Sequence, residues 1–453
     1  MKRFISFCCI LFLIVCMFPT NTQAETALPE LAAETAVLMD AQTGAILYEK
    51  NGNQKMYPAS ITKLLTVLLG IESGQPTREV TITEEVVNTV PRDTTHIALT
   101  CGETVRMNDM LHATMMASAN DAANAVALGV SGSISAFVTQ MNRRMSELGA
   151  LNTHFVNPNG LPNDNHYTTA YDMALLTREA LQNETFRELF GKITYTMDKT
   201  NKNSSSRTFA TLCLLLKNNE DNVRYESAIG GKTGWTVPAK YTMVSAAERD
   251  GRTLIAVVLG CPKGLDRYTD SITLFDYGFD TFRNILIPQT LFAPQTIPII
   301  SGNVIVKNAV VSLPENAMLA TDKIFDPTTL TASSLLPSYL NEEPKSLSLV
   351  LSAKNEKGEN IQVGTIPLNI EIKELDVPAA NGNGSAPQTT QTVTVWEVLG
   401  LILLILLGIL AFMILFFITN NLFRRQRYRK RKERQIQRQR QTQSNPQSNF
   451  ILK

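Results

Sequence analysis

The spacing of apolar residues changes several times along the chain, and each change marks a different predicted element. Two alternating apolar runs in "AVLMDAQTGAILYEK" flank residues 41–44, a pattern that predicts a β-hairpin. After Ser60 the apolar residues recur three and four positions apart, which is the spacing of an amphipathic helix. These apolar residues are Ile61, Leu64, Leu65, Leu68 and Leu69. The folded part therefore begins with a hairpin and a helix.

The middle of the chain is predicted to be helical, and the part after residue 230 to form strands. Residues 80–105 look extended and rich in loops. Helices are predicted over residues 108–129, 134–148, 168–190 and 267–283. Between the last two helices, "YTMVSAAE" and "RTLIAVVLGC" flank the turn Arg249–Arg252 as an antiparallel hairpin.

Strands at both ends of this region and helices between them indicate one α/β (α+β) domain over residues 25–286. We expect an antiparallel sheet flanked by helices, with a helical subdomain inserted in its middle. Residues 291–377 show no helical period, and their short apolar runs predict a small β-rich domain. Residues 378–394 have the composition of a flexible linker.

Both ends of the chain carry membrane signals. Residues 1–24 contain two basic residues, an apolar run and a small-residue exit, which predict a secretory signal peptide. Residues 398–418 are 21 positions without a charge, so one C-terminal transmembrane helix is predicted within 395–420. The basic tail 421–453 stays cytoplasmic by the positive-inside rule. We expect a single-pass protein of the cell membrane whose folded part is extracytoplasmic.

The overall charge of +1 hides a strong asymmetry. The tail carries +10 and the signal peptide +2, so the exported remainder carries −11. An acidic body is unsuited to nucleic acid, whereas the tail suits anionic lipid headgroups of a bilayer. After the signal peptide only Cys101, Cys213 and Cys261 remain. This odd, widely spaced set indicates neither a disulfide framework nor a metal cluster, although a bridge between one pair stays open.

Candidate chemistry begins in "YPASITKLL", where Ser60 and Lys63 are three residues apart. A serine that opens a helix is commonly a cap, and one Ser-x-x-Lys is expected by chance in this composition. The spacing also places both side chains on one helix face, with Cβ atoms about 5 to 6 Å apart. A lysine whose pKa is lowered by desolvation can take the serine proton and so create a nucleophile.

Two further short motifs follow, and each alone has an ordinary structural interpretation. Ser118-Ala119-Asn120 lies in "MMASANDAANAVA" and fits polar positions between helices, while Lys232-Thr233-Gly234 lies in "IGGKTGW" and fits a strand edge. Together with the Ser60 motif, in this order and in an exported chain, they form a set that chance produces rarely. Penicillin-binding proteins and class A β-lactamases carry this set.

The sequence resembles the serine D-alanyl-D-alanine carboxypeptidases, which are low-molecular-mass penicillin-binding proteins. Beyond the three motifs, the similar stretches are "LMDAQTGAILYEKN", "HFVNPNGL", "HYTTAYDMALL" and "RTLIAVVLG". The resemblance is close over residues 34–283 and loose over the β-rich domain. It implies the penicillin-binding/β-lactamase-like transpeptidase fold, cleavage of peptidoglycan stem peptides in cell wall synthesis, acylation by β-lactam antibiotics, and no metal or other cofactor.

The resemblance also implies roles for individual residues. Ser60 would attack the carbonyl between two D-alanines, Lys63 would accept its proton, and Ser118 would relay a proton to the departing amine. Asn120 would hold Lys63 and the substrate amide. Substrate binding would use Lys232, Thr233, Gly234 and Trp235, with the backbone N–H groups of Ser60 and Trp235 around the oxyanion.

Several residues depart from the family pattern, and three alternatives stay open. The departures are Ala119, Asn159, Trp235, the apolar stretch 211–219 and Ala239-Lys240.

A β-lactamase would use Glu179 and Asn183, whose spacing equally fits a helix surface. A Ser-His-Asp hydrolase would need His96, His112, His154 or His166. A non-enzymatic penicillin sensor or wall-binding protein would keep the pocket and use the tail.

Overall fold

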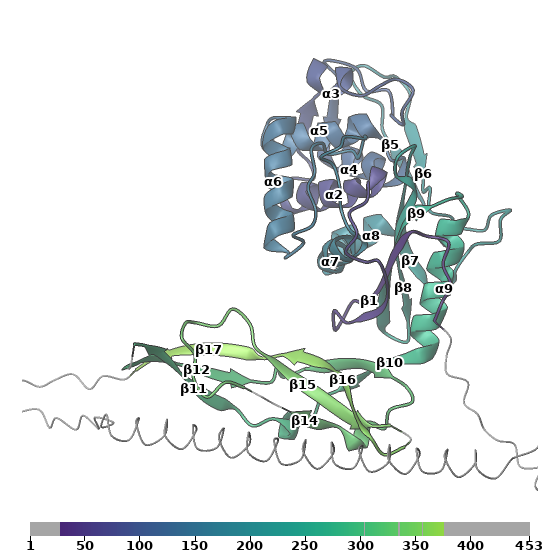
Figure 1. Cartoon of the computed structure of the whole chain (residues 1–453). Coiled ribbons are helices and arrows are strands. Elements are labelled where there is room, and N and C mark those ends of the chain that lie inside the picture. The colour runs from purple at the N-terminus through teal and green to yellow at the C-terminus, as the bar shows by residue number, and fades with distance from the viewer. Residues whose placement is uncertain (1–27, 303, 334–335, 356, 376–453) are drawn as a thin grey trace, which may run out of the picture. The chain divides into compact units, whose positions relative to one another are not determined.

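The computed structural model describes residues 28–302, 304–333, 336–355 and 357–375, and Figure 1 shows their helices and strands. The predicted signal peptide, linker, transmembrane helix and basic tail lie outside the described residues. Within the described ranges, no single helix has the length and apolar composition to cross a bilayer. Among these described residues, the helices 120–131 and 134–147 pass the same criteria as a pair, with a bend of 84° between them.

A five-stranded antiparallel sheet with the strand order β2-β1-β9-β8-β7 organises the larger part of the fold. Both predicted hairpins are confirmed: β1 (Thr35–Asp40) pairs with β2 (Ile46–Lys50), and β8 (Lys240–Arg249) pairs with β9 (Arg252–Cys261). Pairing of β1 with β9 joins segments more than 200 residues apart. β7 (Ala228–Thr236) forms one edge of the sheet.

Both faces of this sheet are buried, which explains why β1 and β9 are apolar at nearly every position. Val37 and Met39 pack into a core shared with the helical region, whereas Leu38 packs on the opposite face with α9 (Asp266–Thr281). Figure 1 shows α9 on one side of the sheet and the other helices on the opposite side. The sheet is therefore the rigid middle layer on which the helices are placed.

The helical region departs from prediction at one instructive place. The stretch predicted over residues 108–129 is helical but not continuous, because the chain forms α4 (Met107–Met116) and α5 (Asn120–Ser131) with a break between them. Ser118 in the break has φ = 56°, a left-handed conformation that a right-handed helix does not contain. The break is the second motif itself.

Two smaller differences have local causes. Residues 168–190 form α7 (Ala170–Ala180) and α8 (Glu184–Phe190), because the Asn183 side chain accepts a hydrogen bond from Phe186 N and starts a new helix. The region predicted as extended and loop-rich contains a short helix, α3 (Glu84–Asn88), between two short strands. Sequence periodicity is too weak over five residues to reveal such a helix.

The remaining elements up to residue 261 are short or lie between those already named. They are η1 (Ala59–Thr62), α2 (Lys63–Glu72), β3 (Glu79–Thr81), β4 (Thr104–Arg106), α6 (Ile134–Glu147), β5 (Thr194–Met197), β6 (Arg207–Ala210) and η2 (Leu214–Leu216).

The part after α9 is rich in β-structure, as the sequence predicts, and has its own core of residues such as Phe292, Leu349 and Leu351. Its antiparallel sheets have the orders β10-β13, β11-β12-β17 and β14-β15-β16. The strands are β10 (Phe282–Leu286), β11 (Gln295–Ser301), β12 (Val304–Ser312), β13 (Met318–Asp322), β14 (Thr331–Ser333), β15 (Ser348–Lys354), β16 (Asn360–Pro367) and β17 (Asn369–Glu374). Two 3₁₀ turns, η3 (Gln289–Leu291) and η4 (Pro327–Thr329), lie among them.

Candidate active site

The Ser60 segment begins as a 3₁₀ turn, η1, which runs directly into α2 at Lys63. No side-chain hydrogen bond caps the start of either element in the described chain, so Ser60 is not the cap that its position suggests. Its Oγ instead lies 2.9 Å from Nζ of Lys63. The three-residue spacing thus produces a direct contact between a hydroxyl and an amine.

Lys63 is fully buried, and two carbonyl oxygens accept hydrogen bonds from its Nζ. One is Asn120 Oδ1 at 2.7 Å, and the other is the main-chain oxygen of Asn159 at 2.5 Å. Asn120 begins α5, directly after the break between helices, and Asn159 belongs to the loop after α6. The amine is therefore enclosed by three separate segments, each of which supplies one polar neighbour.

Lys232 lies on the edge strand β7. Its Nζ donates to Ser118 Oγ at 2.9 Å and to the main-chain oxygen of Thr233 at 2.9 Å. Ser118, Thr233 and Lys232 are all buried. This hydrogen bond joins the second motif to the third, although Ser118 and Lys232 are 114 residues apart in the chain.

Burial changes the protonation of both lysines. Burial, and then the positive charge of Lys232, lowers the pKa of Lys63 well below its ordinary value of 10.5. Burial, and then the positive charge of Arg267, lowers the pKa of Lys232 to about 7. A lysine that is neutral near physiological pH has a lone pair and can accept a proton, which an ammonium group cannot do.

Gly234, the glycine of the third motif, is required because there is no space for a side chain at this position. A Cβ added to Gly234 would lie 2.4 Å from Thr242 Oγ1 and 2.9 Å from the backbone nitrogen of Ser60. Only a residue without a side chain lets β7 approach Ser60 so closely. Trp235 follows with a side chain that is 55% exposed, and its ring centroid lies 6.2 Å from that of Tyr241.

The backbone before Ser60 is also tightly constrained. Ala59 has φ = 53°, an uncommon conformation for a residue with a side chain. A Cβ on Gly160 would lie 1.9 Å from the Ala59 carbonyl oxygen, so the loop at residues 157–161 must carry glycine there. Strained backbone of this kind persists only where the surrounding structure holds it, and such positions cluster at active sites.

The contacts that three residues make at the site were not predicted from the sequence, although Asn159 and His166 were noted there for other reasons. The Asn159 contact uses a main-chain oxygen, which has no signature in the sequence. His166 is buried, accepts from Val156 N and lies 2.9 Å from Thr62 Oγ1, so it braces the Ser60 turn without touching Ser60. Arg267, near the start of α9, donates to the main-chain oxygen of Gly234. In the sequence, the start of the helix predicted over residues 267–283 was the only feature that marked this position.

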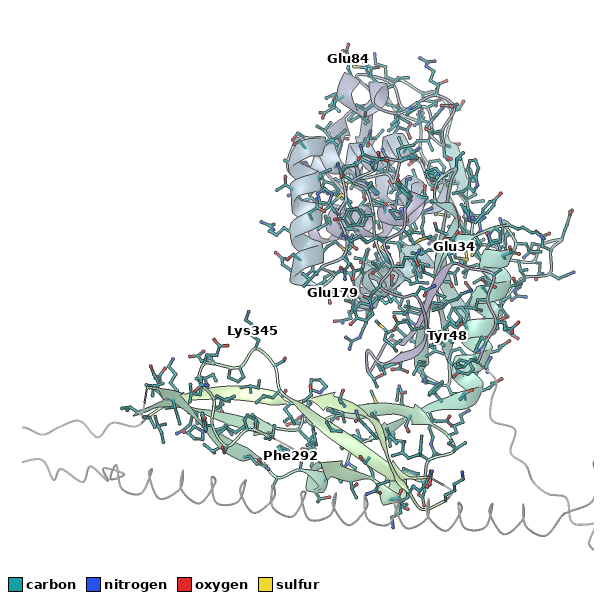
Figure 2. All side chains as sticks on the ribbon, viewed as in Figure 1. Glu34, Tyr48, Glu84, Glu179, Phe292 and Lys345 are labelled. Carbon is teal, nitrogen blue, oxygen red and sulfur yellow. The ribbon has the colours of Figure 1, made fainter. Side chains whose placement is uncertain are left out.

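The residues of the β-lactamase alternative lie elsewhere in ordinary structural roles. Glu179 of α7, labelled in Figure 2, forms an ion pair of 2.7 Å with Arg144, and Asn183 caps α8. Neither contact involves Ser60, Lys63 or their hydrogen-bond partners. The Glu-x-x-x-Asn spacing is therefore explained by helix structure.

The fold and the buried Ser–Lys pair define a serine peptidase of the penicillin-binding type. The chain belongs to the peptidase S11 family, D-alanyl-D-alanine carboxypeptidase, whose pattern matches residues 21–263. It is 33% identical over 289 residues to the D-alanyl-D-alanine carboxypeptidase DacF of Bacillus subtilis. That match covers 62% of this chain and 72% of the relative.

Solved structures agree with this assignment. Penicillin binding protein 5 from Haemophilus influenzae is similar with a TM-score of 0.61 at 25% identity, over 77% of this chain and all of that chain. The Streptomyces K15 DD-transpeptidase is similar with a TM-score of 0.53 at 29% identity, over 56% of this chain and all of that chain. The predicted penicillin-binding fold of antiparallel sheet and helices is confirmed, and the predicted family is correct.

Substitution of Gly234 by alanine is expected to slow acylation of the protein by a labelled penicillin roughly tenfold or more, because the new methyl group pushes β7 away from Ser60. Gly251→Ala is a suitable control, since Gly251 is left-handed (φ 74°) in the β8–β9 turn and nothing lies within 4 Å of its added Cβ. That variant should lower the Tm and leave the acylation rate unchanged. An unaltered rate in Gly234→Ala would show that the close approach is unnecessary.

Replacement of Lys232 by methionine is expected to change how stability depends on pH. In the wild type, Lys232 loses its proton near pH 7 when folded and near 10.5 when unfolded, so folding is penalised below pH 7 and the penalty falls as pH rises toward 10.5. Lys232→Met should therefore melt at a higher temperature than the wild type near pH 6, and the difference should shrink between pH 7 and 10. Parallel melting curves across this range would contradict the lowered pKa.

Proposed function

We propose that the protein removes the terminal D-alanine from peptidoglycan stem pentapeptides through an acyl-serine intermediate. The observation that carries the proposal is the 2.9 Å contact between Ser60 Oγ and the buried Nζ of Lys63. The hydrogen bond between Lys232 and Ser118 adds the remaining motif residues. Family membership supplies the substrate class. D-Alanyl-D-alanine carboxypeptidase activity is the reaction shared by the family and by the named relative in Bacillus subtilis.

Acylation begins when neutral Lys63 accepts the proton of Ser60. The freed Oγ attacks the carbonyl carbon between the two D-alanines and forms a C–O bond. Negative charge then develops on the carbonyl oxygen, where the backbone N–H groups of Ser60 and Trp235 stabilise it. The geometry around Gly234 supports this role, because β7 lies so close to the Ser60 backbone that a Cβ added at Gly234 would be 2.9 Å from Ser60 N.

Collapse of this intermediate breaks the peptide C–N bond, and Ser118 relays the proton held by Lys63 to the departing D-alanine amine, so that Lys63 becomes neutral again. The terminal carboxylate of the substrate lies near Lys232 and Thr233, and Arg267 adds a second positive charge beside Lys232. Water then attacks the acyl-enzyme, which frees Ser60 and releases the shortened peptide. A penicillin acylates Ser60 by the same first step, with its strained amide in place of the peptide bond.

Substitution of Ser60 by alanine is expected to abolish both covalent labelling by penicillin and release of D-alanine from a D-Ala-D-Ala pentapeptide. The wild-type full chain in detergent should show both activities. Wild-type protein that takes up penicillin and releases no D-alanine would favour the alternative of a penicillin sensor. Covalent labelling that persists in Ser60→Ala would remove Ser60 as the nucleophile.

We also propose that the protein is exported and held at the cell membrane by one C-terminal span. The support is in the sequence: the signal-like residues 1–24, the uncharged stretch 398–418 and the basic tail 421–453. In this arrangement the catalytic domain acts outside the membrane, and the tail faces anionic lipid on the cytoplasmic side. The β-rich domain and linker then carry the active site toward the cell wall.

Washing of isolated membranes with high salt tests this anchor. A fully apolar span holds by the hydrophobic effect, which salt does not weaken, so the protein should stay in the membrane fraction and leave only with detergent. A variant truncated after residue 394 should be released into the medium. Extraction of the full chain by salt alone would indicate a peripheral, electrostatic attachment instead.

A further inference from the structure

The Asn120 carboxamide must present its oxygen to Lys63, and its own chemistry does not ensure this. The two ends of a carboxamide have nearly the same shape, and one accepts hydrogen bonds while the other donates them. If the amide were reversed, its NH₂ group would face the lysine nitrogen. Which end points inward is decided by what holds the outer end.

The outer end is held by Thr94, in the loop between α3 and β4. Asn120 Nδ2 donates to Thr94 Oγ1 at 3.1 Å. The Thr94 hydroxyl donates its single proton to the main-chain oxygen of Pro91 at 2.7 Å. A carbonyl oxygen can only accept, so the Thr94 proton is committed and its oxygen can only receive from Asn120. The direction of each hydrogen bond in this relay is therefore fixed from Pro91 inward.

This relay determines how neutral Lys63 meets Ser60. A neutral amine has two N–H groups and one lone pair. Asn120 Oδ1 and the Asn159 main-chain oxygen take the two N–H groups. The lone pair is left for the remaining neighbour, the Ser60 hydroxyl at 2.9 Å. A reversed Asn120 would place an N–H donor against that lone pair and compete with Ser60 for it.

We propose that Thr94 is a positioning residue for acylation: its hydroxyl orients the Asn120 amide so that the lone pair of Lys63 faces Ser60. The inference rests on the proposed role of Ser60 and Lys63 and adds a residue that contacts neither of them. It assigns a function to the loop 89–103, which the sequence marks only as extended and rich in loops.

The loop is attached where this role requires it. The main-chain oxygen of Thr95 accepts from Asn120 N at 2.9 Å. The Asp121 carboxylate accepts from the backbone nitrogens of Ile97 and Leu99 at 3.0 to 3.2 Å. The residues that follow Thr94 are thus tied to Asn120 and Asp121 in the first turn of α5, which keeps the Thr94–Asn120 side-chain contact in register.

The chain contains a matched control in Thr89, just after α3, the helix that begins at Glu84 (Figure 2). Thr89 Oγ1 accepts from Asn124 Nδ2 at 2.9 Å and donates to Glu85 O at 2.7 Å, the same two bonds that Thr94 makes. Asn124 then accepts from the Asn159 side chain, whereas Lys63 uses the Asn159 main-chain oxygen. The Thr89 relay therefore ends at the Asn159 side chain and makes no hydrogen bond to the Asn159 main-chain oxygen that accepts from Lys63. Asn124 Nδ2 also donates to Val86 O at 3.2 Å, so the Asn124 amide has a second support besides Thr89.

The experiment measures acylation of the full chain in detergent by a fluorescent penicillin, over a range of concentrations and times. Thr94→Val is expected to lower the acylation rate constant at saturation about tenfold, with a half-saturating concentration within about twofold of wild type. Thr94→Ser keeps the hydroxyl and should regain most of the rate. Thr89→Val should be acylated at close to the wild-type rate, although its Tm should fall by about as much as the Tm of Thr94→Val.

Three results would overturn the proposal. A wild-type rate in Thr94→Val would show that Asn120 needs no such support, and a Thr94→Ser variant as slow as Thr94→Val would show that the hydroxyl is irrelevant. Equal slowing in Thr89→Val would indicate general loosening of the region. If Thr94→Val unfolds, Thr94→Ala is tested against the same expectations. Failure of wild-type protein to be acylated would instead contradict the proposed function, from which this inference starts.

Discussion

Burial of the Lys63 amine beside the Ser60 hydroxyl is the constraint on which the rest of this structure depends. A charged ammonium group in such a place is costly, so the folded chain favours the neutral amine, and the neutral amine is the form that can act as a base. Lys232 increases the effect, because a second positive charge nearby further disfavours the first. The catalytic potential of the pair thus follows from packing.

Maintaining that burial requires unusual backbone. Ala59 and Ser118 both have positive φ although they carry side chains; Ala59 directly precedes Ser60, and Ser118 is itself a motif residue. Gly160 and Gly234 let neighbouring chain segments approach at distances that no side chain would permit. The five-stranded sheet supplies the rigid support, since β7, which carries Lys232, is an edge strand of a layer buried on both faces. Strain at the site is offset by this surrounding packing.

Much of the fold could be predicted because its signals are local. The two hairpins around residues 41–44 and 249–252 and the helix at 267–283 follow from alternation, turns and helical spacing. The motif residues Ser60, Lys63, Ser118, Asn120 and Lys232 could also be selected, because three short patterns occur in order. In the structure, hydrogen bonds join Lys63 to Ser60 and Asn120, and a further hydrogen bond joins Lys232 to Ser118, two residues before Asn120.

The parts that could not be predicted depend on the backbone. The break at Ser118 replaces a helix that the apolar pattern favours, because a left-handed residue leaves no periodic signal. The Asn159 acceptor is a main-chain oxygen, and every residue has one. Thr94 lies in a loop without periodicity, and its importance arises from a bond to Asn120 across 26 residues. Long-range hydrogen bonds of this kind become visible only in three dimensions.

The protonation of Lys63 tests the account most directly. The protein can be labelled with ¹³C at the lysine side chains and titrated by NMR, with the Lys63 signal assigned by its loss in Lys63→Arg. We predict that Lys63 titrates well below the ordinary lysine pKa of 10.5. A Lys63 signal that titrates together with those of the exposed lysines would mean that the amine stays charged at neutral pH, and Lys63 would then not be the base for Ser60.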